Sequence, residues 1–129
     1  MVIAGLVLVG IAALVHVFIF YLESFAWTGE QARRIFGTGS VEQAASQKEL
    51  AFNQGFYNLF LAIAVALGIA LFVAGQQTVG ATLVFTGAGS MAAAALVLLV
   101  SSPDKAAAAL KQGVIPLLGV LALALGLAL

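Results

Sequence analysis

Residues 2–22 read VIAGLVLVGIAALVHVFIFYL and contain no aspartate, glutamate, lysine or arginine. A helix needs about 20 consecutive, mainly apolar residues to cross the hydrocarbon layer of a bilayer. The stretch therefore predicts a membrane-spanning helix over residues 2–27, with Trp27 at the membrane interface. The apolar run lacks a basic leader and a small-residue cleavage site, so we expect a retained helix and not a signal peptide.

Three further apolar stretches predict spans over about residues 50–74, 77–100 and 112–129, and residues 106–111 could extend the last one. Hydrophobic residues make up 64% of the 129 residues and charged residues only 8%. A soluble domain is about one quarter charged, so lipid must cover this surface. The sequence predicts an all-α integral membrane protein, with residues 1–129 forming one four-helix transmembrane bundle.

The connection between the first two spans, residues 28–47, is polar and predicts a short helix in the membrane interface. Thr28 and Gln31 have the spacing of a capping box at the start of such a helix. Gly37 would end it, and Ser40 can cap the next helix. The apolar face of the short helix would consist of Ala32, Ile35 and Phe36.

The positive charges predict the orientation of the chain. The five basic residues, all in the first and third connections, are Arg33, Arg34, Lys48, Lys105 and Lys111. With four spans these two connections lie on the same side of the membrane. Because lysine and arginine are retained on the cytoplasmic side, we expect both termini to lie outside.

Polar side chains of three predicted spans gather near this cytoplasmic side. They are His16, Glu23, Trp27, Asn53, Gln54, Tyr57, Asn58 and Gln112. His16 and Glu23 share one helix face, and a rise of about 10 Å separates them. We expect these residues to surround a cavity in the cytoplasmic half of the bundle, closed outward by apolar residues.

Ionisable and amide groups are costly within a membrane, so a functional site is the first hypothesis for this cluster. We assign acid–base roles to His16 and Glu23 and a donor role to Tyr57. The predicted ligand contacts are Trp27, Asn53, Gln54, Asn58 and Gln112. A structural reading remains open, in which Asn58 or Tyr57 satisfies a core histidine, Glu23 extends to the headgroups and Trp27 anchors the interface.

Several functional classes are not expected. The formal net charge is zero, which provides no basic patch for nucleic acid. One histidine and no cysteine fall short of a typical metal site, and we predict no cofactor. The sequence has no phosphate-binding loop and no dinucleotide fingerprint. The threonines and serine at every fourth position of residues 78–90 are expected to bond to their own helix.

Four sequence blocks resemble a family of small bacterial membrane proteins catalogued as domain of unknown function 1304. The blocks are HVFIFYLESFAW at 16–27, RIFG at 34–37, NQGFYN at 53–58 and QGVIP at 112–116. Ser24 departs from the methionine expected after the glutamate. The resemblance implies a four-helix protein of the bacterial cytoplasmic (inner) membrane and implies no reaction.

Three functions remain open at this point. The leading hypothesis is a membrane enzyme or binding protein for a lipophilic small molecule that enters from the bilayer. Isomerisation, cyclisation or epoxide opening would suit the residues, because proton transfer needs no metal or redox cofactor. The alternatives are a transporter, which as a homo-oligomer could hold two gates, and a structural accessory subunit. A closed pocket favours the first and a continuous polar path the second.

Overall fold

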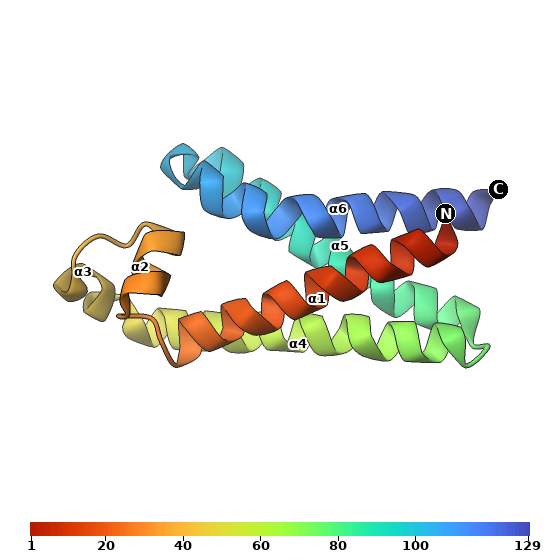
Figure 1. Cartoon of the computed structure of the whole chain (residues 1–129), viewed down its shortest axis with the longest axis horizontal. Coiled ribbons are helices and arrows are strands. Elements are labelled where there is room, and N and C mark those ends of the chain that lie inside the picture. Colours follow the sequence, from red (N-terminus) through yellow and green to blue (C-terminus); the bar gives the residue numbers. More distant parts are fainter.

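The computed structural model describes residues 1–129, and all of its regular elements are helices (Figure 1). The four long helices are α1 (Val2–Ser24), α4 (Lys48–Val73), α5 (Gln77–Ser101) and α6 (Ala106–Ala128), the last preceded by the 3₁₀ turn η1 (Pro103–Lys105). All four are long and apolar enough to cross a membrane. The chain is an all-α membrane protein with four transmembrane helices, which confirms the predicted fold class.

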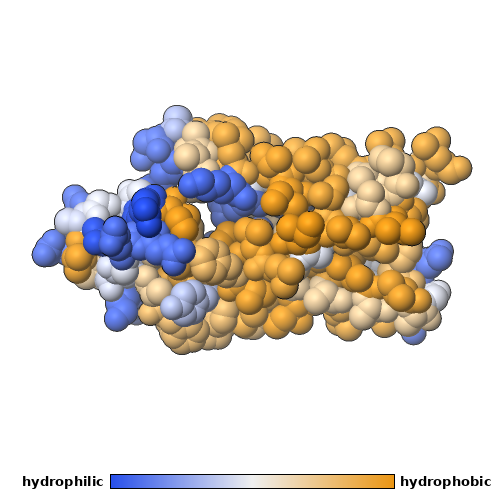
Figure 2. All heavy atoms as spheres, viewed as in Figure 1, coloured by the Kyte–Doolittle hydropathy of each residue, from blue (hydrophilic) through white to orange (hydrophobic).

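The two ends of the bundle differ in composition. Both termini and the α4–α5 turn lie at one end, which we call the terminal end (Figure 1). The α1–α4 and α5–α6 connections lie at the other, which we call the connection end. Hydrophilic residues are concentrated at the connection end, whereas the long helices carry a hydrophobic belt (Figure 2).

The fourth long helix includes the extension over residues 106–111 that the sequence allowed. It begins at Ala106 and not near Gln112, and it follows directly on η1. Pro103 occupies the first turn of η1, where its missing N–H is tolerated and its fixed φ favours a helical start. The early start places Gln112 inside the helix and not at its end.

Two short helices form the α1–α4 connection: α2 (Glu30–Phe36) and α3 (Val41–Ser46). The predicted capping box at Thr28 is wrong, because Gly29 is the N-cap of α2 and no side chain caps it. Gly37 ends α2 at a φ of 63°, a conformation that glycine adopts without strain. Ser40 caps the next helix as predicted, because it forms a capping box with Gln43 at the start of α3.

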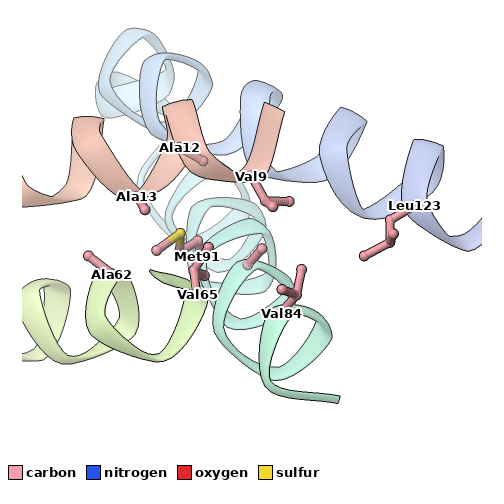
Figure 3. Close-up of a cluster of buried hydrophobic side chains, with 9 residues drawn as sticks. Val9, Ala12, Ala13, Ala62, Val65, Val84, Met91 and Leu123 are labelled. Atoms are coloured by element: carbon pink, nitrogen blue, oxygen red, sulfur yellow. The ribbon is translucent and has the colours of Figure 1, made fainter. Parts of the chain in front are cut away.

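The long helices form a ring in which α1 and α5 each pack against both α4 and α6. Nine buried side chains from all four helices fill its centre and point into the interior (Figure 3). They are Val9, Ala12, Ala13, Ala62, Val65, Val84, Ala88, Met91 and Leu123. The centre of the bundle is therefore filled by apolar side chains.

Glycines set the helix pairing at the terminal end. A Cβ atom added at Gly119 of α6 would lie 2.9 Å from the backbone nitrogen of Val9 in α1. A Cβ atom at Gly68 of α4 would lie 2.8 Å from the Gly80 carbonyl oxygen and from the Val84 nitrogen in α5. Such contacts require glycine, so α1 pairs with α6 here, and α4 pairs with α5.

The pairing changes at the connection end. Gly55 of α4 lies against the Ser24 side chain of α1, and Gly113 of α6 lies against the Ala95 side chain of α5. Figure 1 shows the cause, because α1 crosses from α6 toward α4, while α5 crosses from α4 toward α6. At this end the bundle therefore consists of an α1/α4 pair and an α5/α6 pair with a space between them.

The threonines of α5 bond to their own helix as predicted. The Thr82 and Thr86 hydroxyl groups donate to the carbonyl oxygens of Thr78 and Thr82, each at 2.8 Å. These side chains are exposed at the outer face of the helix. They contribute nothing to the interior.

Gly68→Ala should destabilise the bundle, because the added Cβ would meet backbone atoms of α5 as well as the Val84 side chain, and the backbone cannot easily move away. We expect a loss of about 1–3 kcal/mol in thermal unfolding of the detergent-purified protein. Gly89→Ala in α5 is the control, since nothing lies within 4 Å of its Cβ position. It should be neutral or stabilise by up to about 1 kcal/mol through helix propensity. Equal effects of the two substitutions would contradict the close packing of α4 and α5.

Candidate functional site

The space between the two helix pairs is a cavity of about 320 Å³. Figure 2 shows an opening in the surface where the hydrophilic end meets the hydrophobic belt. All four long helices and the α1–α4 connection contribute to its wall. The lining residues are His16, Glu23, Trp27, Phe36, Thr38, Gln47, Gln54, Tyr57, Asn58, Leu61, Met91, Ala94, Leu98, Lys105, Ala108 and Gln112.

His16 lies on the α1 wall and is only 2% exposed. Its Nδ1 lies 2.9 Å from the Ala12 carbonyl oxygen, one turn back on the same helix. A carbonyl oxygen can only accept, so Nδ1 carries the proton, and in the neutral ring Nε2 is an acceptor. The structural reading had Asn58 or Tyr57 bonding to the ring, but neither of them does so. The Nε2 atom is thus available to the cavity.

Glu23, two turns further along α1, is 8% exposed and faces α4. Its Oε2 accepts a hydrogen bond of 2.7 Å from Nδ2 of Asn58. The same amide nitrogen also donates to the Gln54 carbonyl oxygen at 3.2 Å, which fixes its orientation. Glu23 therefore does not extend to the headgroups but is held inside the bundle at the cavity wall.

The close approach of α1 to α4 brings Glu23 and Asn58 together. Ser24 Oγ donates to the Phe52 carbonyl oxygen at 3.0 Å, and a Cβ atom at Gly55 would collide with Ser24 Oγ. Any larger residue at position 55 would separate the helices. The methionine expected at position 24 could not donate this bond, so the hydroxyl contact is a feature of this chain.

The cavity face of α4 consists of Gln54, Tyr57, Asn58 and Leu61, at the i, i+3, i+4, i+7 spacing of one helix face. Tyr57 is 65% exposed and lies at the mouth of the cavity. Asn53 does not belong to this face. It is exposed, and its side chain donates to the Glu49 carbonyl oxygen at 3.4 Å. The expectation that Asn53 faces the bundle is wrong, because it lies just outside this face, about 40° around the helix beyond Tyr57.

Trp27 is buried and lines the cavity from the start of the connection. Its Nε1 donates to the Ala44 carbonyl oxygen at 2.9 Å, and its ring packs on Phe36 at a centroid distance of 5.4 Å. The side chain thus ties α3 to α2 over the end of the bundle. The sequence predicted a ligand contact for Trp27, with an interface anchor as the alternative, and the structure places the buried ring on the cavity wall.

Three polar residues of the cavity wall were not expected from the sequence: Thr38, Gln47 and Lys105. Thr38 is 8% exposed, and its Oγ1 is buried without a hydrogen-bond partner. Nζ of Lys105 donates to the carbonyl oxygens of Phe36 and Gly37, at 3.1 and 3.3 Å, where α2 ends. A cation is favourable at a helix C-terminus. Nothing in the sequence pairs positions so far apart, and Lys105 had been interpreted only as a topology signal.

Potential metal ligands are sparse. No group of three or more histidine, cysteine, aspartate or glutamate side chains lies close enough together to hold a metal ion. The cavity instead presents one imidazole, one carboxyl group, one ammonium group and several neutral hydrogen-bonding groups. Such a wall is suited to holding and transferring protons.

Residues 10–124 match the sequence profile of a family described as "Protein of unknown function (DUF1304)". The chain belongs to this family. Each of the four blocks that carried the resemblance supplies a wall of the cavity in this DUF1304 protein, for example His16, Phe36, Tyr57 and Gln112. Comparison with curated proteins and with solved structures gives no match.

Asn58→Leu should destabilise the protein by about 1–3 kcal/mol, because it leaves the buried Glu23 carboxyl group without its donor. Thermal unfolding in detergent measures the effect. Asn53→Leu on the same helix is the matched control, because its side chain is exposed and bonds only to its own helix.

A double-mutant cycle tests the pair directly. Combining Asn58→Leu with Glu23→Leu should cost less than the sum of the single changes, with a coupling of about 0.5–3 kcal/mol. Strict additivity would show that the two side chains do not interact.

Proposed function

We propose that this DUF1304 protein binds a lipophilic small molecule in the cavity and converts it by acid–base chemistry. One observation carries the proposal: His16 and Glu23 are both buried, yet both line one cavity inside the bundle. Buried ionisable groups are costly in a membrane protein, so their presence usually indicates a functional site. A purely structural network would fill the space between them with side chains.

The proton roles follow from the hydrogen bonds. With Nδ1 donating to Ala12, the neutral His16 ring can accept a proton from the ligand at Nε2. The Glu23 carboxyl group, when protonated, can donate one. Because the rise between the two residues is about 10 Å, they would act on different atoms of the ligand. Such a pair suits isomerisation, cyclisation or epoxide opening, in which one site loses a proton and another gains one.

The other polar residues would position the ligand. Asn58 is a positioning residue, since it holds the carboxyl group of Glu23. Tyr57 at the mouth can donate its hydroxyl proton, and the amides of Gln54 and Gln112 can orient a polar group. Trp27 provides an aromatic wall. Asn53 has no part in this proposal, because it lies outside the cavity.

The apolar half of the bundle supports a binding cavity over a transport path. Met91 belongs to both the cavity wall and the apolar cluster, so the cavity ends where that cluster begins. Val9, Val65, Val84 and Leu123 are fully buried beyond it. A transporter would need a polar route through these side chains.

For the location, we propose the bacterial cytoplasmic membrane with both termini outside. All five basic residues belong to the connection end, which holds the first and third connections. Positively charged residues near span ends are retained in the cytoplasm. The cavity would then open in the cytoplasmic half of the bilayer.

His16→Ala and Glu23→Gln should each abolish binding or turnover of the native ligand. Glu23→Gln keeps an oxygen that can accept from Asn58, so it should fold normally while losing the acid. Organic extracts of the detergent-purified variants, analysed by mass spectrometry, should lack a molecule that the unchanged protein retains. Asn53→Ala is the control and should retain it.

Two results would count against the proposal. Retention of the same molecule by both variants would remove His16 and Glu23 from the site. Unfolding of both, with no separate loss of ligand, would assign the pair a structural role only.

The orientation is tested by single cysteines, since the chain has none of its own. Glu42→Cys in α3 and Gln76→Cys in the α4–α5 turn both replace exposed residues. In intact cells an impermeant thiol reagent should label Gln76→Cys and not Glu42→Cys. In opened membranes it should label both. The reverse pattern in intact cells would invert the proposed orientation.

A further inference from the structure

A groove of about 210 Å³ runs between α1 and α6 beside the cavity. Its wall is apolar apart from Lys111 and Gln112, which lie at one side. The apolar lining comes from Val15, Phe18, Ile19, Leu22, Ile35, Phe36 and Ala108. The groove exists because α1 leaves α6 toward the connection end, after the close contact at Gly119.

The groove and the cavity lie side by side and share part of their wall. Phe36, Ala108 and Gln112 line both of them. One side of the shared boundary carries the polar groups of the cavity, and the other carries hydrocarbon side chains. Phe18 on the outer wall of the groove is 43% exposed at the lipid-facing surface. A chain lying in the groove could therefore enter sideways from the bilayer.

We propose that the cavity and the groove together hold one single-chain amphiphile, with a neutral hydrogen-bonding head group in the cavity and its hydrocarbon chain between α1 and α6. This inference rests on the proposed function and names the substrate class. A hydroxyl or carbonyl head group meets the chemistry of the wall. The apolar groove supplies the affinity for the chain, since burial of hydrocarbon is favourable and non-directional.

Two observations select a neutral head group. Glu23, the protonated acid of the proposed function, is held by Asn58, and Nζ of Lys105 is held by two carbonyl oxygens, so a charged head group would find no unpaired opposite charge on the cavity wall. Thr38 adds a buried hydroxyl group that no protein atom satisfies. Such a group can both donate and accept, and a hydroxyl or carbonyl head group would satisfy it.

The chain offers a matched control for the groove. A second apolar groove of about 110 Å³ lies between α5 and α6, and its lining includes Leu96, Val114 and Leu117. None of its lining residues belongs to the cavity. A hydrocarbon chain that merely adsorbs to grooves would use both, whereas a chain attached to a head group in the cavity would use only the first.

The probe is hexadecanol with a diazirine in mid-chain, added to the protein in phosphatidylcholine nanodiscs and located after photolysis by peptide mass spectrometry. We expect labelling of α1 and α6 residues that line the first groove. Val15→Trp fills that groove and should lower the labelling by at least about tenfold. Val114→Trp, the same change in the second groove, should leave it unchanged. Equal labelling of the two variants would overturn the proposal.

Two further arms test the head group. Thr38→Val should reduce labelling without lowering the thermal stability, because its hydroxyl group has no protein partner to lose. Unlabelled hexadecanol should displace the probe better than palmitic acid or hexadecylamine does. Unchanged labelling of Thr38→Val, or a charged competitor that displaces the probe as well as the alcohol, would overturn the neutral head group.

The outcomes separate this inference from the proposed function. If Val15→Trp keeps the probe while His16→Ala and Glu23→Gln lose the native ligand, the groove is not a binding site and the acid–base cavity stands. If Val15→Trp excludes the probe while those two variants keep the native ligand, the acid–base proposal fails.

Discussion

The architecture depends on the close approach of helix backbones at glycines. In a bilayer, helices gain no hydrophobic energy by associating, because lipid is as apolar as their side chains, so packing contacts must hold them together. Here those contacts join α1 to α6 and α4 to α5 at the terminal end, through Gly119 and Gly68. At the connection end Gly55 and Gly113 join α1 to α4 and α5 to α6 instead. The exchange of partners leaves a space between two helix pairs.

That space determines what the polar residues can do. If α1 and α6 stayed together along their full length, the groove beside the cavity would close. The contact at Gly55 brings Glu23 within hydrogen-bonding distance of Asn58, while His16 bonds to its own helix and keeps Nε2 free. The two ionisable residues are therefore oriented by different partners. Each is held in place without the other, which suits a pair that acts on separate atoms of a ligand.

The connection between α1 and α4 closes the end of the cavity. Trp27 ties α3 to α2, and Lys105 joins the end of α2 to η1. Thus a cation from the third connection holds the first connection in place. The covering is itself part of the site, since Phe36 and Thr38 line the cavity from it.

The sequence by itself determined the four spans, the end that carries the positive charges and the gathering of polar groups there. These properties depend on hydropathy and helical rise, which are local, and on the need to satisfy every backbone group within a spanning segment. The tertiary structure alone decided which groups meet. It excluded Asn53, set Trp27 between α2 and α3, brought in Thr38, Gln47 and Lys105, and fixed the shape of the cavity, because these outcomes depend on helix rotation and crossing. Those follow from contacts between residues far apart in the chain, which periodicity does not encode.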